Sequence, residues 1–224
     1  GTTLYPSYDG AGNRLSMQDA NQTANGTVIN YSYDALNRLV GISYPDSSLN
    51  VTYAYDVPAT GCYNIGRLTQ ITDSSGSTTY CYDQRGNVLS KVQVTSGTTL
   101  TTTYTYTLSD RVHTITYPSG SVVTYDRDTA VGRVISVKYQ TSATATAQTI
   151  LSNVSYYPFG PANVLTFGNG RTLTKTYDQN YAVGTVASSD PNGLAITAGV
   201  DALGNLMHAS NGTNPPSQTY GYDN

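Results

Sequence analysis

Tyr82-Asp-Gln-Arg-Gly-Asn-Val-Leu89 is repeated, with variations, along the whole 224-residue chain. The Tyr-Asp pair marks each copy, at Tyr8-Asp9, Tyr33-Asp34, Tyr55-Asp56, Tyr82-Asp83, Tyr125-Asp126, Tyr177-Asp178 and Tyr222-Asp223. Degenerate copies stand at Tyr106-Thr107, Tyr156-Tyr157 and Val200-Asp201. The markers divide the chain into intervals of about 24 residues, a period typical of stacked repeat architectures.

The residues after each marker predict a tight turn. Asp9 and Asp201 begin the same pattern as Asp83, namely Asp-x-x-Gly-Asn-x-Leu/Met, and the copy at Asp34 is one residue shorter. Asp at the start of a β-turn accepts hydrogen bonds from backbone N–H groups just ahead, and Gly or Asn supplies the positive φ that such turns need. Tyr therefore closes one strand and Leu opens the next. Two further copies, from Tyr125 and Tyr177, are aligned through a shared Ala-Val-Gly.

A second turn is predicted midway through each repeat. Ile42-Ser-Tyr-Pro-Asp46, Ile71-Thr-Asp-Ser-Ser-Gly76, Ile115-Thr-Tyr-Pro-Ser-Gly120 and Leu165-Thr-Phe-Gly-Asn-Gly170 share an apolar residue, a hydroxyl residue and then turn formers. Each period thus encodes two short strands and two turns. No segment shows a sustained 3.6-residue apolar period, so we expect no helix. The fold class is all-β: antiparallel β-hairpin repeats over residues 1–224, forming a curved, spiralling sheet that is part of a hollow β-shell.

Composition excludes several classes of function. The chain carries 21 Tyr but only 2 Phe and no Trp, and its net charge is −3 with 11% charged residues. A weakly acidic chain without basic clusters is a poor nucleic-acid binder, because that affinity comes mainly from neutralising phosphates. No apolar run approaches the roughly 20 residues that cross a bilayer. We interpret the recurring tyrosines as packing between strands, stacked as ladders along the array.

The two cysteines, Cys62 and Cys81, fit no zinc pattern, which needs four Cys or His ligands. Two readings remain: separate thiols, or one disulfide between neighbouring strands in an oxidising compartment.

Repeats of Tyr-Asp-x-x-Gly-Asn-x-Leu followed by a Tyr-Pro-x-Gly-like turn resemble the YD (RHS) repeat family over nearly the whole chain. The resemblance implies a long strip of β-sheet that spirals into a hollow shell. In bacterial RHS proteins and insecticidal toxin complexes such a shell encloses a toxic C-terminal domain, and related repeats occur in wall-associated proteins and animal teneurins. Asp190-Pro-Asn-Gly-Leu194 is similar to half of the family's self-cleavage motif, but the other half is missing and we interpret it as a turn.

Residues that bear chemistry are sparse. The two histidines, His113 and His208, both fall in predicted strands without Cys, Asp or Glu at metal-ligand spacing. The marker aspartates lie too far apart in the sequence for a calcium loop, so turn capping is the better interpretation. We therefore expect no enzyme activity, no cofactor and no metal site.

The expected function is architectural: a fragment of a longer, secreted or cell-surface bacterial protein whose shell encloses a toxin or other polypeptide. Its partners are then the rest of its own chain, the enclosed domain and further copies that pair through open sheet edges. The alternative is a surface adhesin that binds glycans or proteins through exposed Tyr and Asn.

Overall fold

The computed structural model describes residues 3–5, 7–158, 160–190, 195–201, 203–211 and 218–221. Its strands are β1 (Ser16–Met17), β2 (Ile29–Tyr33), β3 (Leu39–Ser43), β4 (Val51–Tyr55), β5 (Leu68–Asp73), β6 (Gly76–Tyr82), β7 (Val88–Thr95), β8 (Thr98–Tyr106), β9 (Val112–Thr116), β10 (Val122–Arg127), β11 (Val134–Gln140), β12 (Gln148–Tyr156), β13 (Ala162–Phe167), β14 (Thr172–Tyr177), β15 (Val183–Ser188), β16 (Ala195–Val200), β17 (Leu206–Asn211) and β18 (Gln218–Thr219). The helical segments are α1 (Ala20–Asn25) and the 3₁₀ turn η1 (Ser47–Leu49).

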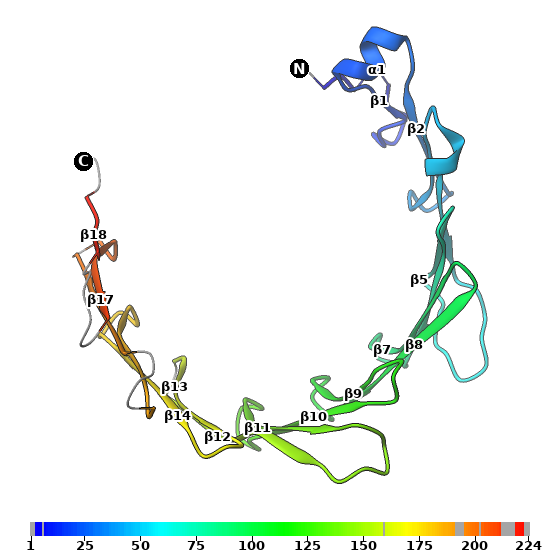
Figure 1. The fold of residues 1–224 in the computed structure, drawn as a ribbon. Helices are drawn as coiled ribbons and strands as arrows, with labels where there is room; N and C mark the ends of the chain where they lie inside the picture. Colours follow the sequence, from blue (N-terminus) through cyan, green and yellow to red (C-terminus); the bar gives the residue numbers. More distant parts are fainter. Residues whose placement is uncertain are drawn as a thin grey trace. The chain divides into compact units, whose positions relative to one another are not determined.

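The described strands belong to one open antiparallel sheet, so the all-β prediction is confirmed. Strands pair with their neighbours in chain order, as β7 does with β8, β11 with β12 and β13 with β14 (Figure 1). The chain divides into two compact units, Gly1–Asp110 with Thr116–Pro118, and Arg111–Ile115 with Ser119–Asn224. Continuity of one repeat array over residues 1–224 stays a prediction.

Each unit is a single layer of sheet. The substantial contacts between described elements join neighbours in the chain, and none joins strands stacked face to face. Among the described residues the only buried large hydrophobic side chains are Ile29, Val122 and Val154. Stability in such a layer comes from strand pairing and from hydrogen bonds between neighbouring repeats.

Turns of two kinds alternate along each unit. Most Tyr-Asp markers lie where an even-numbered strand ends, and we name the turns after these strands corner turns; those after odd-numbered strands are the mid-repeat turns. In an antiparallel meander successive turns lie at opposite edges of the sheet. All corner turns of one unit therefore share one edge, and its mid-repeat turns share the other.

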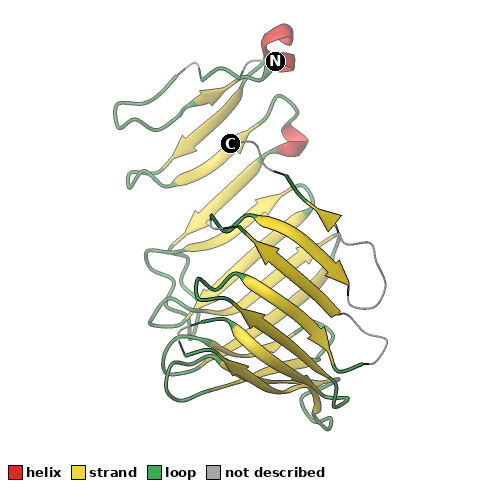
Figure 2. Cartoon of the chain, turned by 90° about the vertical axis from the view of Figure 1, so that its left-hand side faces the viewer, coloured by secondary structure: helices red, strands yellow, loops and turns green. Residues whose placement is uncertain are grey.

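The expectation of no helix is wrong in one short place. Asp19 caps α1 by accepting from the Gln22 N–H at 2.8 Å, and the Gln22 side chain accepts in return from the Asp19 N–H. Gly26 then ends the helix at φ 64°. This capping box stabilises a short helix that has no apolar face. The search for a 3.6-residue apolar period could therefore not detect the helix. Both helical segments are red in Figure 2.

A β-bulge marks nearly every corner. The register shifts at the end of the even strand, between Ser32 and Tyr33, Ala54 and Tyr55, Cys81 and Tyr82, Asp126 and Arg127, Ser155 and Tyr156, Thr176 and Tyr177, and Gly199 and Val200. A bulge places two residues opposite one and disrupts the hydrogen-bond ladder locally. The carbonyl groups at these points therefore need other partners.

Candidate functional site

The corner turn after β6 shows how an aspartate closes a hairpin. Asp83 accepts from the Arg85 and Asn87 N–H groups at 2.9 and 2.8 Å, and its second oxygen accepts from Asn87 Nδ2 at 2.9 Å. The Asp83 N–H donates to the Asn87 carbonyl, while Gly86 adopts φ 98°. These bonds favour the ionised carboxylate, so the pKa of Asp83 lies below its usual value, chiefly through Asn87.

The same arrangement recurs at other markers. Oδ1 of the aspartate accepts from N–H groups two and four residues ahead at Asp9, Asp34, Asp178 and Asp201. The residue three positions ahead has positive φ, namely Gly12, Asn37, Tyr181 or Gly204. We name the corner aspartates as Asp9, Asp34, Asp83, Asp178 and Asp201. Each is bonded to its own turn, and the described residues hold no group of three or more His, Cys, Asp or Glu placed to bind a metal.

Asp126 corrects the sequence alignment. It lies inside β10 opposite Ser136, and its carboxylate pairs with Lys138 Nζ at 2.7 Å, which lowers the pKa of Asp126. Asp128 closes this corner instead, accepting from the N–H groups of Ala130, Val131 and Gly132 at 3.1, 2.7 and 3.0 Å. The strand runs two residues further than the Tyr-Asp pair suggested, so the shared Ala-Val-Gly aligned two turns that are out of register.

The marker tyrosines donate to the bulges. Tyr55 Oη donates to the Leu39 carbonyl at 3.1 Å, and Tyr82 Oη to that of Leu68 at 2.7 Å. Four more bonds follow the same rule: Tyr33 to Arg14, Tyr106 to Val88, Tyr156 to Val134 and Tyr177 to Ala162. In five of the six bonds the acceptor belongs to the residue that begins the odd strand of the preceding corner, and Arg14 lies two residues before β1. The hydroxyl thus satisfies a carbonyl at a disrupted point of the ladder and ties successive repeats together.

Arg127 takes the tyrosine's position at the shifted corner. Its Nε and Nη2 donate to the Val112 carbonyl at 3.3 and 3.1 Å, and its Nη1 donates to the Gly132 carbonyl at 3.1 Å. The position therefore requires a donor long enough to reach the preceding corner, and either a phenol or a guanidinium meets that requirement.

The rings of the marker tyrosines are covered mainly by arginine side chains and less often by other tyrosines. Arg38 lies over Tyr55 with its Cζ 4.3 Å from the ring centroid, and Arg133 lies over Tyr156 at 4.6 Å. Ring-to-ring pairs among the described residues are confined to Tyr80 with Tyr82, and Tyr157 with Tyr177 and Tyr181. The expected ladder of stacked tyrosines is therefore replaced largely by cation–π contacts and hydroxyl bonds.

Polar side chains also link one corner to the next. Arg38 donates to Asp34 in its own turn and to Asp56 in the following one, both at 2.7 Å. Asn87 Nδ2 bridges in the same way from Asp83 to Asp110, at 2.9 Å each. The corner edge of the first unit is thus a continuous polar network.

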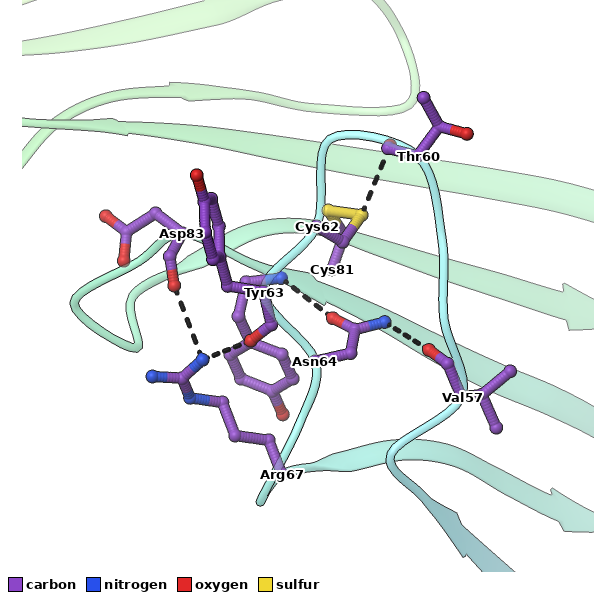
Figure 3. The surroundings of a disulfide bond; sticks show 9 residues. Val57, Thr60, Cys62, Tyr63, Asn64, Arg67, Cys81 and Asp83 are labelled. Atoms are coloured by element: carbon purple, nitrogen blue, oxygen red, sulfur yellow. Dashed lines mark hydrogen bonds between the residues drawn. A yellow bond between two sulfur atoms is a disulfide. The ribbon is translucent and has the colours of Figure 1, made fainter.

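A long loop, which begins at Asp56 after β4, is tied to the next hairpin by a disulfide (Figure 3). Cys62 in this loop is bonded to Cys81 of β6, with 5.2 Å between Cα atoms. Asn64 is 4% exposed; its Nδ2 donates to the Val57 carbonyl and its Oδ1 accepts from the Tyr82 N–H. Arg67 donates to the Tyr63 and Asp83 carbonyls. The sequence predicted a longer loop here, but it did not indicate that the loop contacts the following repeat.

Two cavities flank this loop. One, of about 200 Å³, lies between Val57 and Ala59 of the loop and Thr79 and Val92 of the sheet. The other, of about 290 Å³, lies beside Tyr63 and Ile65. No His, Asp or Glu lines either one.

Both histidines lie in strands. His113 lies in β9 with Nδ1 3.2 Å from the Tyr125 carbonyl oxygen. His208 lies in β17 opposite Gly199, where a Cβ on the glycine would stand 2.0 Å from the imidazole. Tyr222, Asp223 and the Pro191–Leu194 part of the predicted turn fall outside the described residues. None of the described helices is long and apolar enough to span a membrane.

Comparison with known proteins connects this geometry to a family. The family model Teneurin YD-shell matches residues 2–183. The crystal structure of TcdB2-TccC3 superposes with a TM-score of 0.84 at 16% identity, over 98% of this chain and 12% of that one. The TcdB2-TccC3-Cdc42 crystal structure gives 0.83 at 17%, over 99% and 12%.

A Tc holotoxin pore of Photorhabdus luminescens gives a TM-score of 0.81 at 16% identity, over 98% of this chain and 12% of that one. At such identities the likeness concerns the fold, and this chain spans only about an eighth of each of those chains. No curated protein sequence matches. The family match covers most of the chain and includes the corner turns from Asp9 to Asp178, so the chain belongs to the Teneurin YD-shell family.

Proposed function

We propose that this chain is a structural segment of a longer YD-repeat shell that encloses a polypeptide, and that it has no catalytic role of its own. One observation carries the proposal: each unit is a single-layered sheet whose repeats are bonded to one another. A sheet without a second layer has two solvent-facing sides and little core of its own, which suits a wall between two spaces better than a compact binding domain.

The family membership and the TcdB2-TccC3 neighbours support this assignment. Those neighbours are much longer than this chain, which supports a parent protein that supplies the rest of the wall and the enclosed domain. Export from a bacterial cell, as a secreted or surface protein, belongs to the same proposal, because a disulfide such as Cys62–Cys81 persists in oxidising compartments.

The glycan-binding alternative has less support. Six marker tyrosines use their hydroxyls on the protein's own backbone, so these groups are not available to a sugar. A protein that binds glycans through its tyrosines would instead expose their hydroxyls to the solvent.

The test uses the parent chain that carries this segment. Its candidate cargo region is digested with a non-specific protease, alone and within the intact chain. Enclosure predicts that the region resists digestion in the intact chain and becomes sensitive when two adjacent corners are disrupted by Tyr82→Ala and Tyr106→Ala. Equal digestion of the region alone and within the intact chain would refute enclosure. Binding of the 224-residue chain to a glycan array, lost on substituting exposed tyrosines, would instead support an adhesin.

A further inference from the structure

Two strands that a mid-repeat turn connects stop pairing before they reach the corner edge. The ladder between β5 and β6 ends before Leu68, the first residue of β5, and the ladder between β13 and β14 ends before Ala162, the first residue of β13. The hydroxyls of Tyr82 and Tyr177 donate to the carbonyls of these two residues. A marker tyrosine therefore bridges an unpaired stretch between two neighbouring hairpins.

Each junction between neighbouring corners can hold two ties across this unpaired stretch. The first tie is the bond from the marker tyrosine to the preceding corner. The second comes from the residue just before the carbonyl that accepts this bond, and we name it the linking residue; its side chain donates to the following corner. The linking residues Asn13, Arg38, Arg67, Asn87 and Arg133 donate to Asn37, Asp56, Asp83, Asp110 and Tyr157, respectively.

The junction between β15 and β16 differs in both ties. Val200 stands where the marker tyrosine would be, and Ala182 stands where the linking residue would be. Neither side chain carries a hydrogen-bond donor. Pairing of β15 with β16 begins only at Thr185, beyond Val183 at the start of β15. Neither kind of tie therefore bridges the unpaired stretch at this junction.

Among the described corners, every other junction keeps at least one tie. Arg127 supplies the first tie at the shifted corner. Pro161, the residue before Ala162, has no side-chain donor, but the Tyr177 hydroxyl bonds the Ala162 carbonyl at 3.1 Å. The Tyr177 ring also packs edge-on against Tyr157, with 5.7 Å between the ring centroids. The junction between β13 and β14 thus has one tie, and the junction between β15 and β16 has none.

The hairpin beyond this junction is well bonded internally. β16 pairs with β17 from Ile196 to Val200, but with β15 only from Ala195 to Thr197. Asp201 closes the corner of this hairpin by accepting from two N–H groups of its own turn. The hairpin therefore holds together more strongly than it holds to β15.

We infer that the junction between β15 and β16 is a built-in opening point of the sheet. The hairpin of β16 and β17 separates from β15 at the corner edge as one unit, and the chain connection at the opposite edge retains it. Local opening takes place where few bonds must break. The inference concerns the order in which repeats separate and goes beyond the proposed function, because it holds whether or not the sheet encloses a polypeptide.

Hydrogen exchange of the 224-residue chain tests this order. Each missing tie corresponds to a net hydrogen bond, which slows opening roughly fivefold. We therefore expect the amides of β16 and β17 to exchange together, at least about tenfold faster than those of β13 and β14. Equal exchange across β13 to β17, or a gradual rise along β14, β15, β16 and β17 without a step, would overturn the inference.

Val200→Tyr restores the first tie, because this corner has the same bulge as the others, between Gly199 and Val200. The substitution should slow exchange of β16 and β17 about fivefold. Val200→Phe is the matched control: it adds the ring without the hydroxyl and should slow exchange less than about twofold. Equal slowing by both variants would assign the effect to the ring and refute the role of the missing bond.

A second pair of variants tests the inference without altering this junction. Tyr177→Phe keeps the ring against Tyr157 but leaves the junction between β13 and β14 without either tie. The opening boundary should then move, so that β14 and β15 exchange as fast as β16. Tyr156→Phe is the control, because Arg133 still links its junction to the Tyr157 carbonyl, and the boundary should stay in place. Circular dichroism checks that each variant retains its β-structure, and an unmoved boundary in Tyr177→Phe would contradict the inference.

Discussion

Replacing Tyr106 by Phe removes one hydroxyl and leaves the aromatic ring in place. That hydroxyl donates to the Val88 carbonyl at 2.8 Å, at the start of β7, where the pairing with β6 shifts register. Burial raises the pKa of Tyr106, which agrees with a phenol held in its neutral, donating form. A neutral hydrogen bond contributes about 0.5–1.5 kcal/mol net, so we expect a loss of about 1 kcal/mol in the free energy of unfolding.

Tyr104 provides the matched control, since it lies two residues earlier in the same strand and on the same face. No hydrogen bond of its hydroxyl is found among the described residues. Tyr104→Phe should therefore change stability by less than about 0.5 kcal/mol. The double variant Tyr82→Phe with Tyr106→Phe should lose about 2 kcal/mol, because the two hydroxyls have different acceptors.

Urea unfolding of the 224-residue chain, followed by circular dichroism, measures these differences. Hydrogen exchange then locates them: Tyr106→Phe should accelerate exchange in β6, β7 and β8 more than in β13 to β15. Equal effects of Tyr104→Phe and Tyr106→Phe would show that the bonds between hydroxyls and bulges do not hold the repeats together.

Four other predictions follow from the same contacts. Replacing Cys62 and Cys81 by Ser opens a loop of 19 residues in sequence separation and should cost about 3 kcal/mol, measured by thermal unfolding against the oxidised natural chain. Asp128→Ala, which leaves three backbone donors without their acceptor, should lower the urea midpoint more than Asp126→Ala, which removes one partly exposed ion pair worth about 0–1 kcal/mol. Arg127→Tyr should retain most of the stability that Arg127→Leu loses, because only tyrosine among these two replacements can donate to the preceding corner; equal midpoints for both would contradict this role. Hydrogen bonds lower the folded-state pKa of most marker aspartates, so their stabilisation is complete above the unfolded pKa near 3.8 and should fade as the pH drops below it, which an acid titration of the unfolding midpoint in citrate measures.

Local chemistry made much of this fold predictable from the sequence. A carboxylate followed within four residues by a glycine or asparagine closes a turn through bonds that lie entirely within the motif, as at Asp83 and Asp201. The spacing of these turns fixes the strand lengths, and alternating turns then fix an antiparallel meander. The short helix after Asp19 shows the limit of this reasoning, because reciprocal capping stabilised it where no periodic signal existed.

The tertiary structure decided which residue of a degenerate marker occupies the corner and what each tyrosine bonds. The Tyr-Asp pattern favours Asp126 as the corner residue, and only its pairing with Ser136 across the strands places it in the sheet and leaves the corner to Asp128. The acceptors of the tyrosine hydroxyls lie 14 to 22 residues away in the preceding repeat, and the loop from Asp56 reaches the following one. A turn forms through bonds between residues that are neighbours in the chain, so the sequence alone predicts it. Strand register and the contacts between repeats depend on how two hairpins pack against each other, and a single motif does not determine that.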